Sequence, residues 1–73
     1  MKAAQCRMAR AALKLGVRDL AEMAKVSPAT IVRLEAGGDV MERTVDAIRA
    51  ALEAAGVTFS NGDEPGVKLR KAQ

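Results

Sequence analysis

Four interruptions, made by glycine or by a serine–proline pair, confine any helices in this chain to short segments. They lie at Gly16, Ser27-Pro28, Gly37-Gly38 and Gly56, and no glycine or proline occurs between them. Serine caps free N–H groups at the start of a helix, and proline fits the first helical position. Glycine is common at the position just after the end of a helix. The pattern predicts helices at about 2–14, 17–24, 28–36 and 42–55.

Apolar side chains recur every three or four positions within these segments, as they do on one face of a helix. The repeating residues are Cys6, Ala9 and Leu13, then Leu20, Ala21 and Ala24, then Ile31 and Leu34, and finally Val45, Ile48 and Leu52. A chain of 73 residues has room for one domain. We expect these side chains to form a single core, with Cys6 as a buried thiol.

After Gly56 the apolar period changes from the helical spacing to two, which is typical of strands. Val57 and Phe59 share one face of a strand at Val57–Ser60, and Val67 and Leu69 share one face at Val67–Arg70. The intervening segment 61–66, NGDEPG, is rich in turn-forming residues. We expect an all-α fold of four helices in residues 1–56, followed by a β-hairpin and a basic tail in residues 57–73.

The composition excludes several classes of protein. The chain has one Cys and no His, so it lacks the ligands of a zinc site and cannot form an internal disulfide. It has no Gly-rich phosphate loop, and its acids are spread along the helices, so we expect neither an enzyme nor a cofactor. No apolar run is long enough to span a membrane, and the start lacks the apolar core of a signal peptide. We expect a cytoplasmic protein.

The segment 17–36, VRDLAEMAKVSPATIVRLEA, has the layout of two helices that cross at a short turn. Such a crossing needs a small side chain where the two backbones approach, and Ala21 meets that need. The apolar residues Leu20, Ala24, Val26, Ile31 and Leu34 would form a small core beneath the crossing. The outward face of the second of these helices is then left free.

The segment 26–37, VSPATIVRLEAG, closely resembles the corresponding part of the lambda-repressor-like family, the Cro/cI or XRE type of helix-turn-helix protein. The resemblance extends from about Gln5 to Leu52. It includes Arg10 and Glu35, which match a structural salt bridge of the family. It implies a compact four-helix DNA-binding domain with its motif at 17–36. It also implies a transcriptional regulator, of the repressor type, associated with the nucleoid.

Two residues depart from the family pattern. Lys25 occupies the turn position where glycine is usual, because the backbone there takes a positive φ. A non-glycine residue adopts that conformation at a cost of about 1–2 kcal/mol. Val17 replaces a Gln that often contacts the DNA backbone, and it offers only its main-chain N–H.

By this resemblance, helix 28–36 reads the major groove of double-stranded DNA. Base contacts are expected from Pro28, Ala29, Thr30 and Arg33, with Arg33 pairing with guanine and Ala29 touching a thymine methyl. Thr30 would donate to a base edge or a phosphate. Phosphate contacts are expected from Arg18, Lys25, Ser27 and Arg43.

Family members bind palindromic operators as two-fold dimers, so the resemblance also implies a homodimer. The candidate interface is the hairpin, through strand pairing or through Val57, Phe59, Val67 and Leu69. The same apolar face could instead cover the helices of its own chain. Two other functions remain open: an antitoxin that also holds a toxin, and a module that uses this scaffold to bind another protein.

Overall fold

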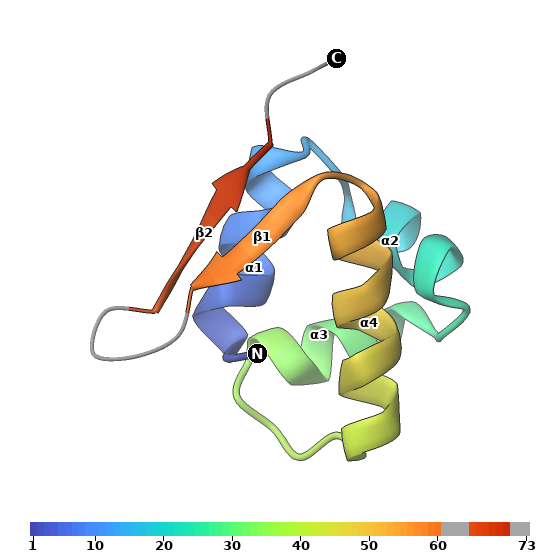
Figure 1. Cartoon of the computed structure of the whole chain (residues 1–73). Coiled ribbons are helices and arrows are strands. Elements are labelled where there is room, and N and C mark those ends of the chain that lie inside the picture. The colour runs from blue at the N-terminus through green and yellow to red at the C-terminus, as the bar shows by residue number, and fades with distance from the viewer. Residues whose placement is uncertain (61–64, 71–73) are drawn as a thin grey trace.

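The computed structural model describes residues 1–60 and 65–70, which form four helices and one two-stranded antiparallel sheet. The elements are α1 (Ala3–Ala12), α2 (Val17–Ala24), α3 (Pro28–Glu35), α4 (Glu42–Ala54), β1 (Val57–Ser60) and β2 (Gly66–Leu69). The helices pack around one core, and the hairpin lies across α1 beside α4 (Figure 1). The predicted order of elements is confirmed. No helix among the described residues is long and apolar enough to cross a membrane.

The core contains the apolar residues that the helical spacing predicts. Leu20, Ile31, Ile48 and Leu52 are fully buried, and the small Ala21 is buried where α2 packs against its neighbours. The other buried apolar side chains are Cys6, Ala9, Ala24, Leu34, Val57 and Phe59. Leu13, Val26 and Val45 pack against this core while remaining partly exposed.

α1 ends at Ala12, two residues earlier than predicted, because Lys14 adopts a left-handed conformation with φ of 57°. The N–H groups of Lys14 and Leu15 then bond back to the carbonyl groups of Ala11 and Arg10 at 3.0 and 2.9 Å. This is a Schellman motif, which satisfies carbonyl groups left free at a helix end. It turns the chain so that Leu15 packs against the core.

The hairpin belongs to the same core as the helices. Val57 is 2% exposed and Phe59 is 8% exposed, and they face the helices of their own chain. They thus cover the helices of their own chain and leave little side-chain surface for a second chain, while the interface between two chains stays a prediction. Val67 is partly buried against the core, whereas Leu69 remains 52% exposed.

β2 begins at Gly66, one residue earlier than predicted, because Gly66 pairs with Ser60 and Val67 with Phe59. Most of the predicted turn, residues 61–64, lies outside the described residues, as does Lys71 of the predicted basic tail. The far end of the hairpin is tied to α4. There the guanidinium of Arg70 donates to the carbonyl oxygen of Glu53 at 2.8 Å. The main-chain N–H of Arg70 donates to the carbonyl oxygen of Gly56 at 2.7 Å.

Gln5 joins α1 to both strands of the hairpin, a contact that sequence analysis did not predict. Its side chain is 1% exposed, and its Nε2 donates to the carbonyl oxygens of Ser60 at 2.8 Å and Gly66 at 3.1 Å. Its Oε1 accepts the N–H of Lys2 at 2.8 Å. Because its nitrogen and its oxygen both have hydrogen-bond partners, burial of this amide costs little free energy. The bonds fix the hairpin against α1.

Lys25 has the left-handed backbone that the sequence predicts, with φ of 59° and ψ of 44°. Substitution Lys25→Gly should therefore stabilise the protein by about 0.5–1 kcal/mol. The substitution removes a backbone strain of about 1–2 kcal/mol. This gain is partly offset because glycine has greater conformational entropy in the unfolded chain. Thermal unfolding should show a midpoint about 3–6 °C higher.

The matched control is Lys25→Ala, which removes the same charge but keeps the strained backbone. It should leave the midpoint unchanged or lower. Equal stabilisation by both variants would show that charge at residue 25, and not its conformation, limits stability.

Candidate nucleic-acid interface

α3 begins at the serine–proline pair, as the sequence predicts. The Oγ of Ser27 accepts the N–H of Thr30 at 3.2 Å, and Pro28 occupies the first turn, where its missing N–H is not needed. A second bond joins the hydroxyl oxygens of Ser27 and Thr30 at 2.9 Å. The cap thus fixes both where α3 starts and how the Thr30 side chain is turned.

One face of α3 is buried and the opposite face is open. Ile31, Leu34 and Glu35 are buried, whereas Pro28, Ala29, Val32 and Arg33 are exposed and Thr30 is half-buried. All four residues predicted to contact bases therefore have surface available for a ligand. The break at Lys25–Ser27 also shows that 17–36 is not one continuous helix.

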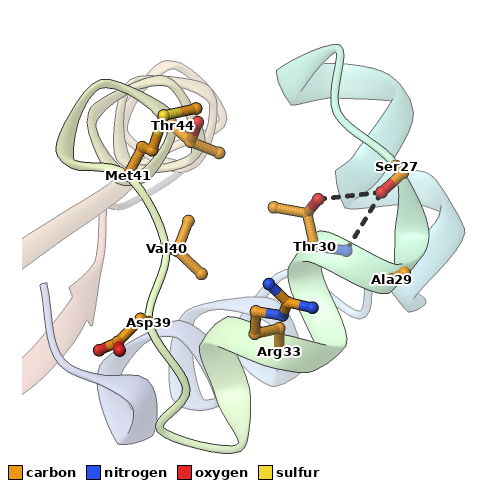
Figure 2. Close-up of a pocket in the computed structure, with 8 residues that line it drawn as sticks. All are labelled: Ser27, Ala29, Thr30, Arg33, Asp39, Val40, Met41 and Thr44. Carbon is orange, nitrogen blue, oxygen red and sulfur yellow. Dashed lines mark hydrogen bonds between the residues drawn. The ribbon is translucent and has the colours of Figure 1, made fainter.

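A groove runs between α3 and the segment that leads into α4, with a volume of about 360 Å³ (Figure 2). We call it the α3 groove. Arg33 and Thr30 lie on its α3 side, and Val40 and Met41 lie opposite. Its lining residues are Ser27, Ala29, Thr30, Arg33, Asp39, Val40, Met41 and Thr44.

A second cavity, at the α2–α3 turn, is lined by Arg18, Lys25 and Pro28 and also by the acidic Glu22. Both cavities are therefore lined by residues at the start of α3. Between them they contain seven of the eight residues predicted to contact DNA. Arg43 lines neither; it is exposed on the first turn of α4, next to Thr44 of the α3 groove.

Gly38 supports the side chain of Arg33, which sequence analysis did not predict. α3 ends in a second Schellman motif: Gly37 has φ of 85°, and the N–H of Gly38 donates to the carbonyl oxygen of Arg33 at 2.9 Å. A Cβ atom at residue 38 would lie only 2.8 Å from Cγ of Arg33 and 3.2 Å from its carbonyl oxygen. The aliphatic part of Arg33 therefore lies directly over the Gly38 backbone.

The predicted pair of Arg10 and Glu35 is present and joins α1 to the last turn of α3. Nε and Nη2 of Arg10 donate to the two carboxylate oxygens of Glu35, each at 2.9 Å. The thiol of Cys6 donates to the same carboxylate at 3.5 Å, and Nη1 of Arg7 donates to the main-chain oxygen of Glu35. The sequence predicts the pair but not the contributions of Cys6 and Arg7.

The contacts around Glu35 shift the pKa values of Glu35 and of Cys6. Hydrogen bonds from Arg10 hold the pKa of Glu35 below its usual range, against the opposing effect of burial. Burial, aided by the Glu35 charge, raises the pKa of the Cys6 thiol to about 12. Cys6 therefore remains a protonated, inert thiol at neutral pH, as expected for a core cysteine.

The charge balance of α3 follows from this pair. Glu35 is the one acidic residue of the helix, and it is buried and neutralised by Arg10. Arg33, Arg18 and Lys25 are exposed, and none of them forms an ion pair within residues 1–60 and 65–70. The open face of α3 itself therefore bears Arg33 and no exposed acid, although Asp39 lines the α3 groove and Glu22 lines the cavity of Arg18 and Lys25.

The Arg10 pair should make stability depend on pH. Because the folded pKa of Glu35 is lower than its unfolded value of about 4.3, the stabilisation is complete above that value and is lost as the pH falls through the folded pKa. Arg10→Met should lower the free energy of unfolding at pH 7 by about 2–3 kcal/mol. A fully buried pair loses about 3–5 kcal/mol, but a quarter of Arg10 is exposed. Thermal unfolding between pH 7 and 3 should show a shallower acid-induced loss in the variant.

The control is Glu53→Gln, which removes the acid of the exposed Arg49–Glu53 pair. It should change the free energy of unfolding at pH 7 by less than about 1 kcal/mol. An acid-induced loss of the same slope in Arg10→Met and in the unaltered protein would contradict the assignment to Glu35.

No family model matches the sequence, and no curated protein is significantly similar to it. The described part of the chain also holds no group of three or more His, Cys, Asp and Glu side chains suited to a metal ion.

Proposed function

We propose that this protein is a sequence-specific DNA-binding regulator, of the repressor type, that inserts α3 into the major groove. The observation that carries the proposal is the open face at the start of α3, which bears Arg33 and no exposed acid. This face has polar and apolar groups that can contact base edges, and the only acid of the helix is turned into the core and paired. An α-helix fits the major groove, where every base pair presents a distinct pattern of groups.

The arrangement of α2 and α3 supports this proposal as a helix-turn-helix. Two helices of eight residues each are joined by three residues, and Lys25 turns the chain with a positive φ. The core residues beneath α2 and α3, the Arg10–Glu35 pair and the resemblance at 26–37 all agree with a lambda-repressor-like domain. In such a domain the first helix of the motif crosses the DNA backbone and the second enters the groove.

The side chains divide by the kind of contact they would make. Arg33 would read guanine through two hydrogen bonds, because its guanidinium matches the O6 and N7 acceptors. Arg18 and Lys25, beside Pro28, would bind phosphates and position the helix without reading sequence. Arg43 would reach a phosphate from the start of α4.

The proposal includes a second copy of the chain, because a single small DNA-binding domain gives limited sequence specificity. Dimers of this class bind two half-sites about 10 bp apart, so the operator would be palindromic. Of the four apolar hairpin residues, Leu69 is the one that leaves substantial surface for such a contact. Removing the hairpin is not a usable test, because Val57 and Phe59 hold the core together.

The proposal predicts different losses for Arg33→Ala and Arg18→Ala, measured by fluorescence anisotropy on a duplex selected from a random pool by the unaltered protein. Arg33→Ala should cost about 1–3 kcal/mol on the selected site and relax the preference at one base pair. Arg18→Ala should weaken binding to selected and random DNA alike. It should also lower the slope of log K against log salt by about one.

Lys68→Ala is the matched control, because it removes one exposed positive charge from the hairpin. It should leave both affinity and salt slope nearly unchanged. Failure to select any preferred duplex, or binding to DNA that does not weaken with salt, would overturn the proposed function. A partner bound without salt dependence would instead favour a protein-interaction module.

A further inference from the structure

We infer that the α3 groove recognises the 5-methyl group of a thymine, through the methyl group of Thr30. This inference deepens the proposed function and rests on it. It differs from the expectation drawn from the sequence, in which Thr30 donates a hydrogen bond to a base edge or a phosphate. The difference comes from the way the serine cap holds the Thr30 side chain.

The hydroxyl group of Thr30 is turned toward Ser27, at one end of the groove. Its Oγ1 lies 2.9 Å from the Oγ of Ser27, which also accepts the N–H of Thr30 at 3.2 Å. Figure 2 shows both bonds, with the methyl group of Thr30 pointing toward the side where Val40 lies. The cap therefore favours the rotamer in which the methyl group of Thr30 lies toward Val40 and the hydroxyl is engaged by Ser27.

Apolar side chains also line the groove, beside the polar Arg33, Asp39 and Thr44. Ala29 and Val40 line the same groove and offer only methyl groups, and Met41 adds an exposed apolar chain on the opposite side. In the major groove, the 5-methyl group of thymine is the one apolar feature of the base edges, and it is matched by alanine and by the methyl of threonine. Cytosine lacks that methyl group. The apolar part of the α3 groove, at Thr30 and Val40, therefore suits a thymine methyl group.

The first test changes the DNA. Each thymine of the selected duplex is replaced in turn by deoxyuridine, which keeps base pairing and loses only the methyl group. Affinity should fall about fourfold at one position of each half-site, as expected for one methyl group no longer buried. No loss at any position would overturn the inference, whereas a duplex that is still selected and bound would leave the proposed function standing.

The second test uses a matched pair of variants at residue 30. Thr30→Val keeps a methyl group without the hydroxyl, and Thr30→Ser keeps the hydroxyl without the methyl. Thr30→Val should retain the preference for thymine over deoxyuridine, and Thr30→Ser should lose it. The reverse result would show that the hydroxyl reads the DNA and would overturn the inference. Circular dichroism confirms that each variant folds.

We propose independently that Gly38 is a positioning residue for Arg33. A methyl group at residue 38 would come within 2.8 Å of Cγ of Arg33, closer than such contacts occur, so the arginine would have to leave its present rotamer. Cγ lies near the start of the side chain, and a change there displaces the whole guanidinium. The absence of a side chain at Gly38 thus keeps Arg33 directed along the α3 groove.

The test is a double-mutant cycle with Gly38→Ala and Arg33→Ala on the same selected duplex. Gly38→Ala alone should weaken binding to that duplex about 2- to 10-fold, the range of a disfavoured rotamer, and leave binding to random DNA unchanged. In the Arg33→Ala background it should have no further effect. A full additional loss in that background, or an equal loss on random DNA, would overturn the positioning role.

Discussion

The ion pair between Arg10 and Glu35 is the interaction on which the orientation of α3 depends. It places two charge-assisted hydrogen bonds between α1 and the last turn of α3, in a position where little water can replace them. Arg7 and Cys6 add two more contacts from the same helix to Glu35. Because Glu35 faces inward, the residues on the opposite side of α3 face outward. The direction of the candidate interface is thus set by a buried carboxylate that takes no part in it.

Local signals in the sequence predict most of the helix boundaries. Ser27-Pro28 and Gly37 mark the ends of α3 because the groups that cap a helix lie within a few residues of its end. The end of α1 could not be predicted, because Lys14 carries no such local signal. It ends α1 in the conformation that glycine usually takes, and nothing in its side chain distinguishes it from a residue inside a helix. Its conformation is imposed by Leu15, whose packing against the core requires the chain to turn.

Contacts between distant residues could not be predicted in this way. Alternating apolar residues after Gly56 predict a strand with one apolar face, but they are equally consistent with a face buried within one chain or between two. The three-dimensional structure is needed to show that Val57 and Phe59 are buried in the core of their own chain, where β1 packs against α4. The candidate site shows the same limit. The sequence predicts which side chains surround the start of α3, whereas the turn of Thr30 toward Ser27 and the contact of Gly38 with Arg33 depend on three-dimensional geometry.

The bonds from Gln5 to the hairpin have a consequence for how the molecule assembles. They link residues 55 and 61 positions apart, far longer separations than those within the helices. Proteins with many such distant contacts fold more slowly than simple helical bundles, because a long loop must close before the contacts form. During synthesis on the ribosome, α1 would therefore leave the ribosome before the hairpin. Until the hairpin is made, the face of α1 that it covers would stay exposed. The order of translation thus separates Gln5 from the two carbonyl groups that it binds.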